Sequence, residues 1–235
     1  MEVRMPDKQK LILAIGAHIG DMELTTGGLL ATCALKGWKV ITVSLTASEK
    51  SAGEGQDLVG FKAMKVREAT AFAATLGGEA KVFDIPDGLL SVNDELSFQI
   101  CDLIRKYRPE IIVTHYKSSH KDHMACKTIV EHARFYASLA GFARQDPAFD
   151  VPNLYYAENW EDASDFKPYV YYDTSAGYAL WKQALEKEES VMQCPFFPIA
   201  EYYDLKSRLR GMLMHCEHAE CFMLPDDKCF SFNQI

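Results

Sequence analysis

The sequence predicts an α/β fold with a mostly parallel sheet, and two observations support this prediction. Over about the first 143 residues, short apolar runs alternate with longer amphipathic segments, which is typical of βαβ units with right-handed crossovers. The chain has 235 residues, enough for one domain with a sizeable core. We therefore expect a single domain over residues 1–235, with a core of about residues 10–143 and a C-terminal elaboration of about residues 144–235.

Each element of the core has its own local signal. The apolar run Leu11–Ala17 predicts a strand, and Leu24–Leu35 predicts a helix that Gly37 closes. Val40–Leu45 is β-branched and predicts a second strand, whereas Phe61–Leu76 repeats its apolar residues near a 3.6-residue period. The remaining core elements are a strand at Lys81–Asp84, a helix at Leu96–Tyr107, a strand at Ile111–Thr114 and a helix from about Asp122 to Ala143.

The pattern changes after residue 143, where aromatic strands are expected at residues 154–157 and 168–173. Helices are expected at Ala179–Met192 and Tyr202–His215. Together the elements predict a Rossmann-like three-layer sandwich. Open parallel sheets bind ligands at the carboxyl ends of their strands. We therefore expect the site to follow Gly16, Leu45, Asp84 and Thr114.

Composition excludes several classes of function. The net charge of −8 and the pI near 5.4 argue against broad binding of nucleic acid or of anionic membranes. No stretch approaches the roughly 20 apolar residues of a membrane span, and the charged N-terminus lacks the apolar core of a signal peptide. The seven cysteines are odd in number and scattered, which predicts reduced thiols in a cytoplasmic protein.

Histidines and aspartates gather after two of the expected strands. His18 and Asp21 follow the first strand with i, i+3 spacing, and "HYKSSHKDH" after the fourth strand contains His115, His120, Asp122 and His123. Two histidines and one carboxylate suit a divalent metal with an open position, zinc most readily and iron(II) as an alternative. Each segment alone also fits a bland interpretation, since Asp21 would serve as a helix N-cap. Two such segments at one edge of the sheet favour the metal.

These segments resemble the PIG-L/LmbE-like zinc-dependent N-deacetylases. "AHIGDMELTTGG" is similar to the family's "AHPDDE…GG", and "SHKDH" to its "HPDH". Weaker likenesses run in order through the chain: "LTASEKSAGEG" to "T-x-GE-x-G", "VREATAFAATLGG" to "R-x-E…AA-x-LG", "IPDG" to "PDG" and "HAECF" to "YAEAF". The likeness spans most of residues 10–223.

The resemblance implies roles for particular residues. It implies that His18, Asp21 and His123 bind Zn²⁺. It also implies that His120 steadies the oxyanion or protonates the departing amine, and that Asp122 orients His120. Arg67 and Glu54 are the residues that it implies contact the substrate.

One departure from the motif concerns the base. The residue two positions after the first histidine of "HPDDE" is the general base of the family, and this chain has Gly20 there. A base contributes about 10²–10⁴-fold, so its loss removes roughly 3–5 kcal/mol of transition-state stabilisation. The candidates to replace it are Glu49, Glu54, His115 and Glu158.

Two other patterns have ordinary explanations. "HCEHAECFMLPDDKC" near the C-terminus lacks the spacing of a structural zinc site and is better explained as a helix end with incidental thiols. "GAHIG" lacks the third glycine of a dinucleotide fingerprint, which argues against an NAD site.

The sequence therefore predicts a cytoplasmic zinc hydrolase that removes an acyl group, most simply acetyl, from an N-acylated amino sugar or related amide. Its partner would be a small-molecule substrate, and the resemblance permits a homo-oligomer, either a trimer or a hexamer. Gly20 favours the alternative, a metal-binding but catalytically weak homologue that binds a glycan or small ligand. An Fe(II) oxygenase is the third hypothesis, and the parallel α/β sheet argues against it.

Overall fold

A computed structural model of the chain describes residues 9–160, 165–194 and 197–225. Its strands form one seven-stranded sheet in the order β3-β2-β1-β4-β5-β7-β6. The strands are β1 (Leu11–Gly16), β2 (Lys39–Thr46), β3 (Glu79–Ile85), β4 (Ile111–His115), β5 (Asn153–Ala157), β6 (Val170–Asp173) and β7 (Ala219–Met223). The first five run parallel, and β7 lies antiparallel to both β5 and β6. The predicted α/β fold with a mostly parallel sheet is confirmed.

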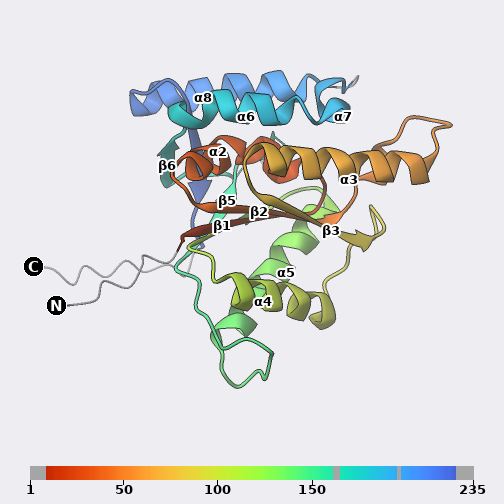
Figure 1. The fold of residues 1–235 in the computed structure, drawn as a ribbon, viewed down its shortest axis with the longest axis vertical. Helices are drawn as coiled ribbons and strands as arrows, with labels where there is room; N and C mark the ends of the chain where they lie inside the picture. The colour runs from red at the N-terminus through yellow and green to blue at the C-terminus, as the bar shows by residue number, and fades with distance from the viewer. Residues whose placement is uncertain (1–8, 161–164, 195–196, 226–235) are drawn as a thin grey trace, which may run out of the picture.

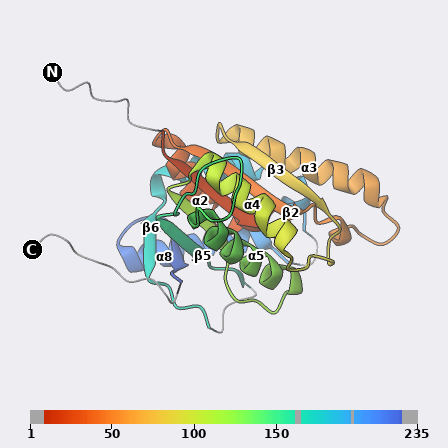
Figure 2. The same ribbon diagram turned by 90° about the horizontal axis from the view of Figure 1, so that it is seen from below.

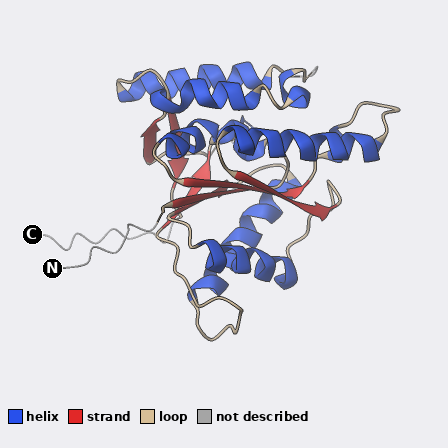
Figure 3. Cartoon of the chain, in the orientation of Figure 1, coloured by secondary structure: helices blue, strands red, loops and turns tan. Residues whose placement is uncertain are grey.

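Helices cover both faces of the sheet (Figure 1). The helices are α1 (Asp21–Thr25), α2 (Gly27–Leu35), α3 (Leu58–Thr75), α4 (Asp94–Tyr107), α5 (Lys121–Ser138), α6 (Tyr178–Leu185), α7 (Glu189–Met192) and α8 (Ile199–Met214). The helices α2 and α3 lie on one face, and α6, α7 and α8 lie outside them, as the blue layers of Figure 3 also show. From below, α4 and α5 cross the other face (Figure 2).

The strand β1 explains why the sheet is buried on both sides. All six of its residues are buried, and successive side chains of a strand point to opposite faces. Leu13 and Ile15 pack into the core beneath α4 and α5, whereas Ile12 and Ala14 pack into the core that contains Trp181 of α6. An apolar run without alternation is what a strand covered on both faces requires.

The structure differs from the sequence prediction in the C-terminal third. The helix expected at Ala179–Met192 is two helices, because Glu188 has the non-helical angles φ −99° and ψ 72° where α7 begins. The helix expected to reach Ala143 ends at Ser138. The strand β7 was not predicted, since its five residues (AECFM) show no alternation and it is fixed by pairing with β5 and β6.

Two sequence expectations about thiols and membranes are checked in part. Within the described residues, no helix has the length and apolar character that a membrane span needs. Cys33, Cys101, Cys126 and Cys221 are free and buried. Cys229, part of the C-terminal segment considered for a structural zinc, lies outside the described residues.

Candidate metal centre

The candidate site lies where the chain order of the sheet reverses. From β1 the sheet continues to β2 and β3 on one side and to β4 and β5 on the other, and such a switch point leaves a crevice at the carboxyl ends of the strands. After β1 the loop contributes His18 and the start of α1 contributes Asp21, and after β4 the N-cap and first turn of α5 contribute His120 and His123. The structure thus brings together the two segments that the sequence analysis selected.

Gly20 shapes the loop that presents His18 and Asp21. Gly20 has φ +104°, a left-handed conformation that glycine adopts at little cost. This turn starts the helix α1 at Asp21, and the backbone N–H of Gly20 donates to Oε2 of Glu23 at 3.1 Å. The backbone N–H of His18 donates to Oδ2 of Asp21 at 2.7 Å, which fixes the aspartate beside the histidine.

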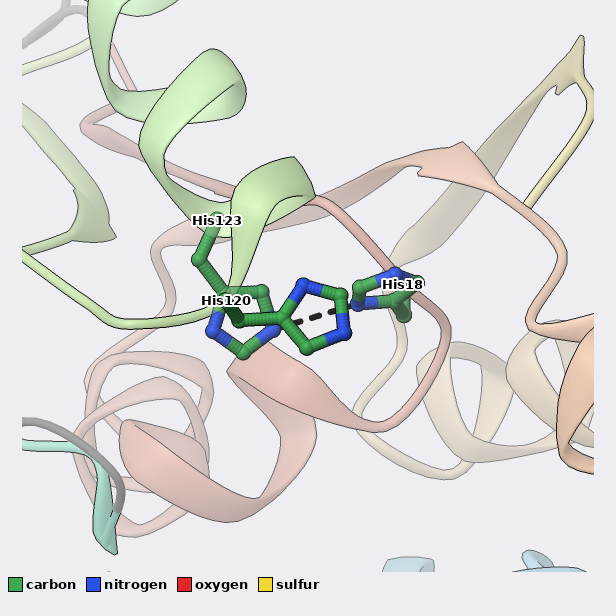
Figure 4. Close-up of side chains that lie close together, drawn as sticks. All are labelled: His18, His120 and His123. Atoms are coloured by element: carbon green, nitrogen blue, oxygen red, sulfur yellow. Dashed lines mark hydrogen bonds between the residues drawn. The ribbon is translucent and has the colours of Figure 1, made fainter. Parts of the chain in front are cut away.

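The start of α5 presents the other two histidines. His120 is the N-cap residue, and its Nδ1 accepts a hydrogen bond from the backbone N–H of Asp122 at 3.2 Å. A neutral imidazole that accepts at Nδ1 holds its proton on Nε2, so His120 is able to donate from Nε2. His123 lies one turn further on, and its ring stacks on that of His120 with centroids 4.4 Å apart (Figure 4).

The donor atoms of His18, Asp21 and His123 converge. Nδ1 of His18 lies 3.2 Å from Nε2 of His123 and 3.3 Å from Oδ2 of Asp21. Oδ1 of Asp21 lies 3.5 Å from Nε2 of His123. Ligands about 2.0–2.1 Å from a tetrahedral zinc ion are separated by about 3.3 Å. The residues present therefore fit a zinc-sized divalent cation.

Further histidines and carboxylates surround these three residues. Among the residues that the structure describes, three overlapping groups have ligand atoms within 4.8 Å of one another: His18 with His120 and His123, Asp21 with His115 and His123, and His18 with Asp87 and Asp122. The expected set of ligands is spread over the first two groups. Asp87 was not selected from the sequence, and its only signal was the "IPDG" turn.

The electrostatics of this cluster favour a cation. Burial lowers the pKa of His18, but the carboxylates of Asp21 and Asp87 outweigh it and raise that pKa to about 10. Burial raises the pKa of Asp21, and His123, His18 and His115 outweigh it, so that the pKa lies well below its usual range. Oδ1 of Asp87 lies 3.2 Å from Nε2 of His18. A positive charge is thus stabilised at the place where the donors meet.

Other side chains hold the ligand set from behind. Nε2 of His115 lies 3.0 Å from Oδ2 of Asp21, and the His115 ring stacks on His123 with centroids 4.0 Å apart. Nδ1 of His123 lies 3.4 Å from Oγ of Ser118 and 3.3 Å from Nδ2 of Asn159. Partners on the far nitrogen of a ligating histidine fix its orientation.

A cavity of about 940 Å³ opens over the cluster. Its lining includes His18, Gly20, Asp21, His120 and His123, together with the cationic side chains of Lys50 and Lys65. Cavities of this size suit a small organic ligand. Lys65 is buried on α3 and was not selected from the sequence.

The remaining predicted residues lie in different surroundings. Arg67 and Glu54 are exposed, and neither is part of the described lining of the cavity. Glu158 pairs with Arg210 and Lys206 beneath a different, smaller pocket. Asp122 is fully buried, and its Oδ2 accepts a hydrogen bond from the backbone N–H of Gly88 at 2.8 Å. The hydrogen bond between Asp122 and His120 is made by the backbone N–H of Asp122 and not by its carboxylate.

Besides His115, Glu49 is the replacement-base candidate that contacts the charged cluster. It is buried, and its Oε1 accepts from the backbone N–H of Asp87 at 2.8 Å. Its Oε2 has no hydrogen-bond partner among the described residues. Glu49 does not itself line the cavity, whereas the neighbouring Ser48, Lys50 and Asp87 do.

The family model described as "PIG-L: GlcNAc-PI de-N-acetylase" matches residues 13–134. This match covers more than half of the chain and both segments of the metal centre. The chain belongs to the PIG-L family. The predicted family is thereby confirmed, and the match ends before the C-terminal third.

Two relatives of this PIG-L protein are named for different activities, one as a hydratase and one as a deacetylase. A 4-oxalmesaconate hydratase of Pseudomonas putida KT2440 is 25% identical over 221 residues, which cover 88% of this chain and 82% of the relative. A 1D-myo-inositol 2-acetamido-2-deoxy-α-D-glucopyranoside deacetylase of Thermomonospora curvata is 26% identical over 175 residues, which cover 61% of this chain and 58% of the relative.

Solved structures agree on the fold. The crystal structure of GalB, the 4-carboxy-2-hydroxymuconate hydratase of Pseudomonas putida KT2440, superposes with a TM-score of 0.86 at 20% identity. The superposition covers 97% of this chain and 100% of that structure. The PIG-L relatives therefore include both deacetylases and hydratases.

Proposed function

We propose that this PIG-L protein is a metal-dependent hydratase, which adds water to a carbon–carbon double bond conjugated to a carbonyl or carboxylate group in a small polycarboxylic acid. The observation that carries the proposal is the absence of a carboxylate at position 20. The relative that covers 88% of the chain is named a hydratase. Both observations favour the same chemistry.

Position 20 disfavours amide hydrolysis for a physical reason. Amide hydrolysis needs a base that takes a proton from water and a proton donor for the departing amine. A Cβ built on Gly20 would lie 3.4 Å from Cγ2 of Val191 and 3.6 Å from Oε2 of Glu188, and φ is +104°. A carboxylate there would be strained and would face another carboxyl group. Addition of water to a double bond also needs a base for the water, but it releases no amine and so needs no proton donor for a departing nitrogen.

His18, Asp21 and His123 would hold the metal in this proposal. When bound, a zinc ion lowers the pKa of a bound water to about 7 and polarises a carbonyl oxygen. Glu49 would accept the proton that the attacking water loses, through its unpaired Oε2. His120 would donate from Nε2 to the substrate oxygen on which negative charge develops.

The lysines of the cavity would recognise the substrate carboxylates. Lys50 and Lys65 both line the cavity. Lys65 is buried and takes the role that the resemblance implied for Arg67, which is exposed together with Glu54. The lining also includes the carboxylates of Asp21, Asp87 and Glu189, so the two ammonium groups would be the contacts for the carboxylates of the substrate.

Deacetylation of an N-acetylated amino sugar is the second candidate. It is supported by the description of the family model and by the name of the Thermomonospora curvata relative. In that case Glu49 would have to replace the base of the family motif. The metal centre and His120 would serve both reactions, so the substrate decides between them.

The test uses one zinc-loaded preparation and two substrate panels. Loss of ultraviolet absorbance reports hydration of conjugated di- and tricarboxylic acids, and amine release reports deacetylation of N-acetylated sugars. We expect hydration of at least one acid, no amine release, and loss of hydration in His123→Ala. Amine release without hydration would replace the proposal with the second candidate. Bound zinc without either activity would support the non-catalytic binding protein.

A further inference from the structure

The outward face of α8 is apolar, which reverses the usual arrangement of a surface helix. Four large apolar side chains lie on this face, with exposed fractions of 55% for Leu205, 56% for Leu209, 75% for Met212 and 57% for Leu213. Their spacing of three and four residues places them along one stripe of the helix. Such a stripe normally faces the core of a protein, and its exposure to water costs free energy.

The opposite side of α8, which packs against the rest of the chain, is largely polar. Its buried residues are Tyr203, Ser207 and Gly211. The partly buried side chains of Lys206 and Arg210 pair with Glu158 after β5. The helix lies in the outermost layer of the molecule (Figure 1). The apolar stripe is therefore not what attaches α8 to this chain.

An apolar groove adjoins the N-terminal end of the stripe. The groove has a volume of about 330 Å³ and lies where α6 and α7 meet the start of α8, with Met192, Phe197 and Pro198 in its lining. Glu201 also lines it, and Met212 lies about 16 Å further along the helix at 1.5 Å per residue. The same face thus has a groove at one end and a protruding apolar ridge at the other.

Two opposite charges flank the stripe along one edge. Glu201 and Arg208 are both exposed. They are two turns apart, about 10 Å along the helix axis, which is too far for them to pair within one helix. If two such helices lie antiparallel, the acid of each is able to meet the base of the other.

We propose that two copies of this chain pair through α8, with the two helices antiparallel about a two-fold axis near Leu205. Glu201 of each copy then meets Arg208 of the other, and Met212 of each copy covers the groove of the other. A two-fold contact uses the same patch on both copies and needs a surface that is complementary to itself. The ridge, the groove and the two charges give this face that property.

The charges of α8 argue against a membrane surface as the occupant of the stripe. Helices that lie on membranes are rich in lysine and arginine on the polar face. Within α8, all of which the structure describes, Arg208 is the only exposed cation, because Lys206 and Arg210 pair with Glu158. The net charge of −8 also disfavours an anionic membrane.

The contact would support one wall of the cavity over the candidate metal centre. Val191, Cys194 and Ile199 line both the groove and that cavity. Ser190, next to Val191, accepts a hydrogen bond from Nζ of Lys65 at 3.0 Å. A second copy over the groove would restrict the movement of this wall. The inference does not depend on which reaction the cavity supports.

Sedimentation equilibrium of the full chain tests the assembly. We expect the wild type to associate, and Leu205→Glu and Met212→Glu each to raise the dissociation constant by about 30-fold or more, the effect of losing an interface hot spot. Leu139→Glu, at an exposed apolar residue after α5 on the other face of the sheet, is the matched control and should associate as the wild type does. A hexamer that the α8 variants divide into trimers would equally support the proposal, since two-fold contacts join trimers.

Two results would overturn the proposal. One is a wild type that stays monomeric at its highest soluble concentration, and binding of that monomer to phosphatidylserine vesicles would then identify a membrane as the occupant. The other is an assembly that the α8 variants leave unchanged, which would place the interface elsewhere.

A charge swap tests the antiparallel register. Glu201→Arg and Arg208→Glu each bring like charges together, and we expect each to weaken association by about 10-fold, because every dimer contains two such pairs. The double variant carries both changes and restores opposite charges, so it should regain most of the lost affinity. Both residues are exposed, so the fold of the monomer should be unaffected. A double variant as weak as the single ones would overturn the proposed pairing.

Discussion

Nδ1 of His18 and Nε2 of His123 lie 3.2 Å apart, although 105 residues separate the two histidines in the chain. One follows β1 and the other follows β4, and these two strands are parallel neighbours. Their carboxyl ends meet at one edge of the sheet, where Asp21 completes the set of donors. The sheet topology therefore builds the candidate metal centre.

Removal of one ligand should destroy this centre. We expect His123→Ala to weaken zinc binding by more than about 100-fold, since loss even of an outer partner of a ligand costs about 10–100-fold. Zinc content after dialysis against a weak chelator measures the effect. The exposed His132→Ala on the same helix is the matched control. Equal zinc content in the two variants would remove His123 from the ligand set.

His115 should act on the metal through Asp21. Its ring is 1% exposed and its Nε2 lies 3.0 Å from Oδ2 of Asp21. We expect His115→Asn to lower zinc affinity by about 10–100-fold while the protein stays folded, because the aspartate loses the group that orients it. Competition with a chromophoric chelator gives the affinity. If His115 were instead the base, kcat would fall while zinc affinity stayed unchanged.

Restoring an acid at position 20 should not create a deacetylase. Gly20→Asp would carry the strain of φ +104° and would place a carboxylate near Glu188. We expect at least a 100-fold lower rate than the wild type in its own reaction and no amine release. Gly20→Ala shares the backbone strain without the charge, so the difference between the two variants measures the repulsion. Amine release by Gly20→Asp would show that position 20 alone separates the two activities.

Glu220 should make the stability depend on pH. Its Oε1 and Oε2 accept from the backbone N–H groups of Gly28 and Leu29, both at 2.8 Å. Burial raises the pKa of Glu220 from 4.5 to about 8. Above pH 4.5 the unfolded chain loses a proton that the folded protein keeps, so stability falls from about pH 4.5 to about pH 8 and is level above that range.

The variant Glu220→Gln tests this dependence. It should show a shallower decline of Tm between pH 5 and 8, even if its Tm at pH 5 is lower. Glu217→Gln, an exposed neighbour, is the control. A decline equal to that of the control would contradict a proton held by Glu220.

Local signals were sufficient for much of the N-terminal half. The apolar run of β1 and the β-branched run of β2 each identify a strand buried on both faces, and right-handed crossovers limit the strand orders that are possible. The i, i+3 pairs His18/Asp21 and His120/His123 follow the carboxyl ends of β1 and β4, so their approach could be expected before the fold was known.

The C-terminal half was less predictable, because its structure depends on distant partners. The helix expected at Ala179–Met192 breaks before Glu189, and no glycine or proline marks the break.

On α3 the sequence resemblance pointed to Arg67, but Lys65 is the residue that lines the cavity. Residues two positions apart on a helix, such as Lys65 and Arg67, point about 200° apart around the helix axis. Packing against the sheet therefore decides which of the two faces the site.

Residue types and short spacings were enough to indicate the α/β class, the family and the candidate metal ligands. Which carboxyl groups accompany these candidate ligands depends on contacts between distant segments of the chain. The tertiary structure placed Asp87 against His18 and Glu188 behind Gly20. Glu188 is 168 positions away from Gly20, and no local pattern specifies contacts between residues so far apart along the chain.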